Sequence, residues 1–181
     1  TNSSIYQLNL INNQINNSIS NNFNSLFSII DNTSTSIGKR KLKETLLNPI
    51  LNIEELNRRY DIIDAFMSHN RNGNSHYKHL ETYLNRIMDI ERLHRKMGLS
   101  LLQPADFATL DFSYEHVQNI LNINIPELNT LKPDKKIIKE FNNFRYQYSN
   151  DFNMDEIVKY HLDKINGSFF RKNVFQEIDI V

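Results

Sequence analysis

Apolar side chains recur along most of this chain at spacings of three and four residues, and this periodicity is the strongest constraint on its fold. Such runs cover 53–67, 107–121, 137–148 and 154–165. Residues at these spacings share one face of an α-helix. The pattern therefore predicts an all-α, multi-helix domain whose helices turn their apolar faces toward one core.

Helix boundaries are marked by residues that cap or break helices. Asn52 followed by Glu55 is a variant of the capping box and predicts a helix start between them. Pro104 suits the first position of a helix, which places Asp106 in the first turn, where negative charge is favourable. We expect a short extended N-terminal segment and loop at 1–24, a helical core domain at 25–167 and an exit segment at 168–181.

Charge and composition limit the function classes. Lys plus Arg and Asp plus Glu are 21 each, so the net charge is zero, whereas a dedicated nucleic-acid binder normally carries a basic excess. There is no cysteine, which removes disulfides and thiolate chemistry. Without an apolar run long enough to cross a bilayer or a signal peptide, we expect a soluble intracellular protein in an undetermined compartment. Because residue 1 is Thr, we expect it to be a piece of a longer chain.

No pattern in the sequence specifies an active site. Gly38-Lys39 lacks the upstream glycine and the following Ser or Thr of a phosphate loop, so we expect no ATP site and no catalytic, cofactor or metal site in these residues. His76 and His79 could share a helix face, but a solvated pair is favoured over a metal site. The basic side chains of Lys39, Lys41 and Arg58 could contact phosphate, although a solvated helix face is the better interpretation.

Four sequence blocks form an ordered series. The first reads Asp-Asn-Thr-Ser-Thr-Ser-Ile-Gly-Lys-Arg over 31–40 and reaches Asn-Pro at 48–49; the others are Leu-Asn-Arg-Arg-Tyr-Asp at 56–61, Asp-Ile-Glu-Arg-Leu at 89–93 and Gln-Pro-Ala-Asp-Phe at 103–107. Together they resemble the core domain of the MutS family of DNA mismatch-repair proteins. The residues that carry this resemblance, each expected to have a structural role, are Asp31, Thr33, Thr35, Gly38, Arg40, Pro49, Arg59, Asp61, Asp89, Glu91, Arg92, Pro104 and Asp106.

Each block also has a local physical interpretation. Asp31, with Thr33 and Thr35, can cap the following helix. Gly38 suits a close approach between helices, and Arg40 is placed for a buried or interhelical pair with a carboxylate. Pro49 ends the helix before it, because the residue preceding a proline is pushed out of the helical region. Glu91 and Arg92 are candidates to bond neighbouring helices.

The resemblance also implies a role for a longer protein. MutS-like proteins are dimeric ATPases that enclose mismatched or branched DNA, and their core domain joins the DNA-binding and ATPase parts. ATP and Mg²⁺ are then expected outside this segment, and the other parts of the longer chain are its direct partners. Residues 169–179 sit where the family enters its long lever helix but lack the family's glycine, and the Phe-Gln-Glu at 175–177 is at the wrong end of the chain for the mismatch reader.

Two other function classes fit the same sequence. A free-standing helical adaptor would bind a protein partner through an exposed apolar groove. A sequence-neutral nucleic-acid-binding module would use the basic face and would weaken steeply with salt. A metal-dependent enzyme is a more distant third.

Overall fold

The computed structural model describes residues 8–11, 25–69, 73, 75–160, 167–174 and 177, and nearly all of the regular structure in them is helical. The helices are α2 (Leu26–Ile30), α3 (Ser36–Leu47), α4 (Ile53–Met67), α5 (His76–Leu84), α6 (Ile90–Gly98), α7 (Pro104–Asn122), α8 (Pro126–Asn129), α9 (Lys135–Asp151) and α10 (Met154–Ile157). Within the described part, β-pairing is limited to two isolated bridges. The predicted all-α fold is confirmed.

The chain divides into two compact units, residues 1–81 and 82–181. The boundary falls inside α5, whereas the sequence predicts one helical domain over 25–167 with a single core. Those predicted bounds stay a prediction, and the extended segment expected at the N-terminus lies almost entirely outside the described residues. Of that segment, residues 8–11 are described, and they form a turn.

The first unit contains α2, α3, α4 and most of α5. Asn52 caps α4 as predicted, because its Oδ1 accepts a hydrogen bond from the backbone N–H of Glu55 at 3.0 Å. The apolar stripe expected to face a core is, however, largely exposed; Ile53 is 72% and Tyr60 59% exposed. The physical reason is that the described part of this unit buries only Ser25, Ser75 and Leu80, so no apolar surface covers the stripe.

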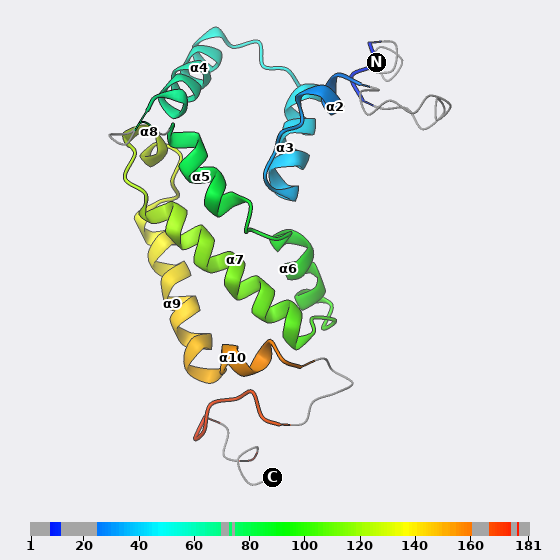
Figure 1. Cartoon of the computed structure of the whole chain (residues 1–181), viewed down its shortest axis with the longest axis vertical. Helices are drawn as coiled ribbons and strands as arrows, with labels where there is room; N and C mark the ends of the chain where they lie inside the picture. The colour runs from blue at the N-terminus through cyan, green and yellow to red at the C-terminus, as the bar shows by residue number, and fades with distance from the viewer. Residues whose placement is uncertain are drawn as a thin grey trace. The chain divides into compact units, whose positions relative to one another are not determined.

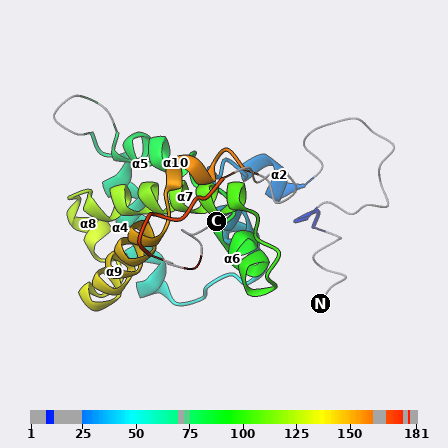
Figure 2. The same ribbon diagram turned by 90° about the horizontal axis from the view of Figure 1, so that it is seen from below.

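The second unit is built around α7. Figure 1 shows α6 and α9 on opposite sides of α7, with α10 near the end where α7 begins, and Figure 2 shows the same arrangement from below. The hydrophobic core consists of Leu93, Leu110, Tyr114 and Tyr148 from three helices, with Phe107 and Phe141 among the side chains packed around it. Thus α7 turns its apolar face toward the core as predicted, since Leu110 is completely buried and Tyr114 is 6% exposed.

The last described segment packs on the end of α9. Phe152 pairs with Phe170 in an antiparallel bridge, and the N–H of Asn153 donates to the carbonyl of Phe169 at 2.7 Å. Ile157 of α10 is 1% exposed, as its apolar position predicts. The predicted stripe continues to His161 and Ile165, which lie outside the described part of the chain. Residues 175 and 176 of the Phe-Gln-Glu sequence also lie outside it.

Candidate functional site

The turn between α2 and α3 is organised by the first block of motif residues. The Oδ1 atom of Asp31 accepts hydrogen bonds from the Thr33 hydroxyl at 2.6 Å and the Thr33 N–H at 3.3 Å. Its Oδ2 atom lies 2.6 Å from Nζ of Lys39, and the hydrogen bonds from Lys39 and then Thr33 lower the pKa of the Asp31 carboxyl. Thr35 is the residue that caps α3, because its Oγ1 accepts from the N–H of Gly38 at 2.9 Å. Asp31 therefore fixes the turn rather than the helix end.

Gly38 lies against this turn and not against another helix. A Cβ placed on Gly38 would come 3.0 Å from Oγ1 of Thr35 and 3.7 Å from Cβ of Thr33. The close approach expected at this glycine is thus local, within the cap of α3. Arg40 is exposed, so the buried form of its expected carboxylate pair is excluded. Pro49 follows Asn48, where α3 ends as predicted.

The basic side chains proposed to contact phosphate are matched by neighbouring carboxylates. Lys39 pairs with Asp31, and Lys41 pairs with Glu44 at 3.1 Å. On α4, Glu55 binds Arg58 at 2.8 Å and Arg59 at 2.9 Å. The hydrogen bonds from Arg58 and then Arg59 lower the pKa of Glu55 to about 2. Asp61, the other motif residue of α4, is exposed.

The basic face predicted from the sequence is therefore an alternating set of ion pairs on two exposed helices. Exposed pairs of this kind contribute little stability each, but they reduce the net positive charge that could attract phosphate. Phosphate contact by Lys39, Lys41 and Arg58 stays a prediction that this arrangement disfavours.

The third and fourth blocks meet in the second unit. Asp89 caps α6, since its Oδ1 accepts from the N–H of Arg92 at 3.2 Å. Pro104 begins α7 and is buried. Asp106, in the first turn of α7, accepts from Nζ of Lys96 on α6 at 2.8 Å and from the N–H of Gln103 at 3.3 Å. The two blocks therefore tie α6 to α7.

The electrostatics at Asp106 favour its ionised form. Burial raises the pKa of the Asp106 carboxyl, but the hydrogen bonds from Lys96 and Gln103, with the charges of Lys96 and Arg92, lower it below its ordinary value overall. The positive charge of Arg92 on α6 thus helps to lower the pKa of Asp106 on α7. Glu91 and Arg92 are both exposed on α6.

A partly buried polar network between α7 and α9 was not predicted from the sequence. Asp111 on α7 accepts from the hydroxyl of Tyr148 and from Arg145 Nη2 at 3.2 Å, both on α9. Arg145 also donates to Gln118 of α7. Burial first, and then the hydrogen bond to Asp111, raises the pKa of Tyr148. The signal available in the sequence was the polar Asp111 beside the buried position Leu110, but its partners are 34 and 37 residues away.

Two further buried polar groups on α7 also escaped prediction. Ser113 is completely buried; its hydroxyl accepts from the N–H of Met88 at 3.1 Å and donates to the carbonyl of Thr109 at 2.9 Å. It thereby fastens the connection before α6 to α7. His116 is 7% exposed, and neither of its ring nitrogens has a hydrogen-bond partner among the described residues. Its ring packs against Phe112 with the ring centres 4.5 Å apart.

Aromatic side chains complete the junction of α7 and α9. Phe107 meets Tyr148 edge to face at 5.3 Å, and Tyr114 meets Phe141 in the same manner at 5.5 Å. Such pairs contribute about 1 kcal/mol each beyond the area that they bury. The Tyr114 hydroxyl also hydrogen-bonds to a ring nitrogen of His94 on α6. Tyr114 therefore contacts α9 through its ring and α6 through its hydroxyl.

Among the described residues, no cluster of three or more His, Asp or Glu side chains could hold a metal ion. No helix in the described part is long and apolar enough to cross a membrane. The motif residues that the structure places are caps, ion pairs and packing positions, and the fold is that of an all-α domain.

Comparison with known proteins identifies this domain. Residues 3–168 match the family description of MutS domain III, so the chain belongs to the MutS domain III family, as its sequence blocks indicated. It is 33% identical to a putative DNA mismatch repair protein mutS homologue of Acanthamoeba polyphaga mimivirus, over 98% of this chain and 16% of that protein.

Shorter matches reach cellular members of the family. The chain is 50% identical to the DNA mismatch repair protein MutS of Borreliella burgdorferi, over 23% of this chain and 5% of that protein. It is 44% identical to the DNA mismatch repair protein MSH3 of Vanderwaltozyma polyspora, over 24% of this chain and 4% of that protein. The chain thus spans less than a fifth of the length of each of these relatives.

Proposed function

We propose that this chain is the non-catalytic core domain of a MutS-like DNA mismatch-repair ATPase, where it links the DNA-binding and ATPase parts and transmits conformational change between them. The proposed longer protein is an intracellular homodimer that binds mismatched or branched DNA and takes ATP and Mg²⁺ outside this segment. The chain itself contributes packing, not bond-making.

The observation that supports this role is the joint between α6, α7 and α9. Lys96 and Asp106 connect α6 to α7, and Asp111, Arg145 and Tyr148 connect α7 to α9. Coupling between distant sites requires packed elements that move as units between discrete arrangements. Charge-assisted hydrogen bonds have strict geometry, so helices joined by them favour movement as one body over gradual deformation.

The proposal is tested first with the chain alone. We expect no ATP hydrolysis and equal, weak binding to matched and mismatched duplexes at physiological salt. Mismatch-selective binding by the isolated chain would refute the structural role. The control variant Lys41→Gln should leave DNA binding unchanged, because the charge it removes is already paired with Glu44.

The coupling is tested in a full-length MutS-like protein that carries this domain. Tyr148→Phe should loosen the junction of α7 and α9. We expect ATP-dependent release of DNA to slow or lose its nucleotide dependence, while the separate affinities for ATP and for DNA stay close to wild type. Unchanged nucleotide-dependent release, in a variant shown to have the junction weakened, would refute the coupling role.

A further inference from the structure

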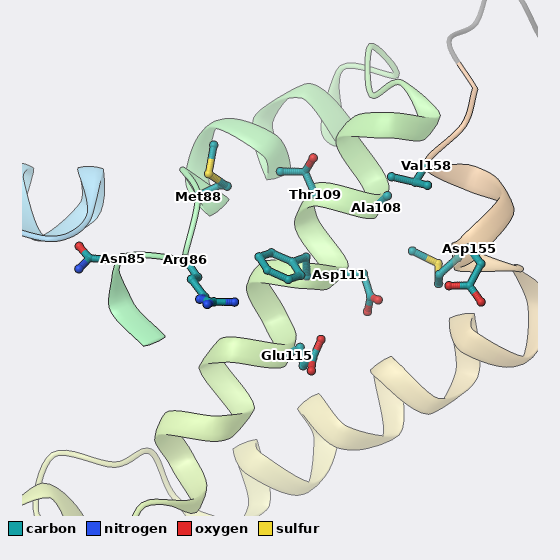
Figure 3. Close-up of a pocket in the computed structure, with 11 residues that line it drawn as sticks. Asn85, Arg86, Met88, Ala108, Thr109, Asp111, Glu115, Asp155 and Val158 are labelled. Carbon is teal, nitrogen blue, oxygen red and sulfur yellow. The ribbon is translucent and has the colours of Figure 1, made fainter. Parts of the chain in front are cut away.

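A groove lies within the second unit, on the side of α7 that faces the connection before α6 and the start of α10. Its volume is about 710 Å³ and it is open to solvent. Figure 3 shows the side chains that line it, which come from α7, from α10 and from the segment between α5 and α6. No family-motif residue lines it, although Asp111 of the α7–α9 network is one of its lining residues.

The floor of the groove is apolar and exposed. Met88, Phe112 and Val158 are 53%, 45% and 61% exposed, and Met154 and Ala108 also line it. Methionine side chains are flexible and polarisable, and they are common on surfaces that accept apolar partners. Phe112 is fixed from behind by the buried ring of His116. The floor thus combines one aromatic side chain that is packed in place, Phe112, with two flexible methionines, Met88 and Met154.

The margins of the groove carry opposite charges. Glu115 on α7 and Asp155 on α10 are exposed, and neither forms a hydrogen bond or ion pair with the described residues. Arg86 lies at the other margin, and its guanidinium likewise has no partner in the described part of the chain. Asp111 also lines the groove, but its charge is matched by Arg145. The carboxylates of Glu115 and Asp155 therefore make the α7 and α10 margin acidic, although the charge of Asp155 also acts on Lys159 and raises its pKa. The other charged side chain of the margins is the basic Arg86.

We propose that this groove binds an amphipathic helix of a separate polypeptide, whose apolar stripe is bordered by Lys or Arg residues facing Glu115 and Asp155. A helix is the fitting occupant because the described part of this unit offers no strand edge for an extended peptide, and an apolar helix face suits an open groove. A small molecule would need a more enclosed site, since such sites bury most of the ligand's surface. Charge complementarity at the margins sets the chemistry of the partner.

The test uses the whole chain and two designed peptides. Each peptide has about 15 residues, enough for a marginally stable helix, and carries a leucine stripe with one Trp. One peptide has Lys along the border of the stripe, and in the other each Lys is replaced by Glu. Because the chain contains no Trp, a shift in Trp emission reports the peptide alone.

We expect the Lys peptide to bind more tightly than the Glu peptide. The double variant Glu115→Lys with Asp155→Lys should weaken the Lys peptide by roughly 2-fold to 25-fold, which corresponds to about 0.2–1 kcal/mol for each of two exposed ion pairs. It should also strengthen binding of the Glu peptide. Glu54→Lys, an exposed reversal in the first unit, is the matched control and should weaken the Lys peptide far less.

A second pair of variants tests the apolar floor. Val158→Asp should abolish binding of the Lys peptide, whereas Leu131→Asp, at a position 50% exposed and outside the groove, should not. Unchanged helix content by circular dichroism shows that both variants are folded.

Three outcomes would overturn the proposal. In the first, both peptides bind equally well to the wild-type chain. In the second, binding survives Val158→Asp. In the third, the chain forms a dimer that Val158→Asp abolishes and that excludes the peptides, which would make a second copy the occupant. The proposal does not depend on nucleotide coupling, so it can fail independently of the proposed function.

Discussion

The hydroxyl of Tyr148 offers the sharpest test of how the second unit is held together. It donates a hydrogen bond to Asp111, which also binds Arg145 at 3.2 Å, and the side chains of Arg145 and Asp111 are 19% and 23% exposed. A hydrogen bond to a charged group contributes about 1.5–3 kcal/mol. Tyr148→Phe removes only the hydroxyl and keeps the ring contacts with Phe107 and Phe144. We therefore expect the free energy of unfolding to fall by about 2 kcal/mol.

That loss is large enough to measure. For a domain of this size it corresponds to a decrease in Tm of about 4–8 °C. Thermal and urea unfolding followed by far-UV circular dichroism give the value, and hydrogen exchange shows whether the amides of α7 and α9 lose protection together. Tyr146→Phe is the matched control, since Tyr146 lies on the same helix, is 70% exposed, and its hydroxyl has no partner among the described residues.

The reasoning would be refuted if Tyr148→Phe and Tyr146→Phe changed stability equally. High pH gives an independent check, because burial and the hydrogen bond to Asp111 raise the pKa of Tyr148 in the folded state. A raised pKa stabilises the fold at pH values below the unfolded pKa of about 10, and this contribution is lost as the pH rises beyond it. The wild type should therefore lose stability more steeply than Tyr148→Phe above about pH 10.

Other substitutions test the remaining features. Gly38→Ala should destabilise by about 1 kcal/mol, because its Cβ would press on the capping hydroxyl of Thr35, whereas Gly98→Ala, with open space around it, should be neutral or stabilising in the same unfolding assay. His116→Leu should leave stability unchanged or raise it by about 1 kcal/mol, since it removes a buried ring whose two nitrogens have no partner in the part of the chain that the structure describes; a clear loss of stability would show that the imidazole has a partner. The lowered pKa of Asp106 contributes stability that is present above about pH 4 and lost as the pH falls, so Asp106→Asn should flatten the acid side of the stability profile.

The sequence predicted the helices well because the information that specifies them is local. The starts of α4 and α7 follow from Asn52 and Pro104, and the end of α3 follows from the pair Asn48-Pro49. Each signal acts within one turn of the helix that it bounds. The four family blocks were equally readable, because each is a short run of residues in a fixed order.

The faces of the helices were less predictable than the helices themselves. The stripe on α4 and the stripe on α9 have the same spacing, yet Tyr60 is 59% exposed and Tyr148 is 6% exposed. Periodicity shows which residues share a face, but it carries no information on what covers that face. Gly38 shows a similar limit: the sequence indicated a close contact without specifying its partner, and the nearest atoms belong to the preceding turn.

The contacts that support the proposed role depend on long sequence separation. Asp111 could have paired with any of the 21 Lys and Arg residues, and only the packing of α9 on α7 selects Arg145. A chain with a net charge of zero can therefore still form a specific ion pair between two helices. The helix packing decides which opposite charges meet, whereas the net charge is only their sum. Asp111 and Arg145 are partly buried, so removing one partner leaves the other with less compensation from water than on an open surface. Coupled hydrogen bonds of this kind favour one relative position of α7 and α9, and a defined position is what the proposed role of transmitting movement requires.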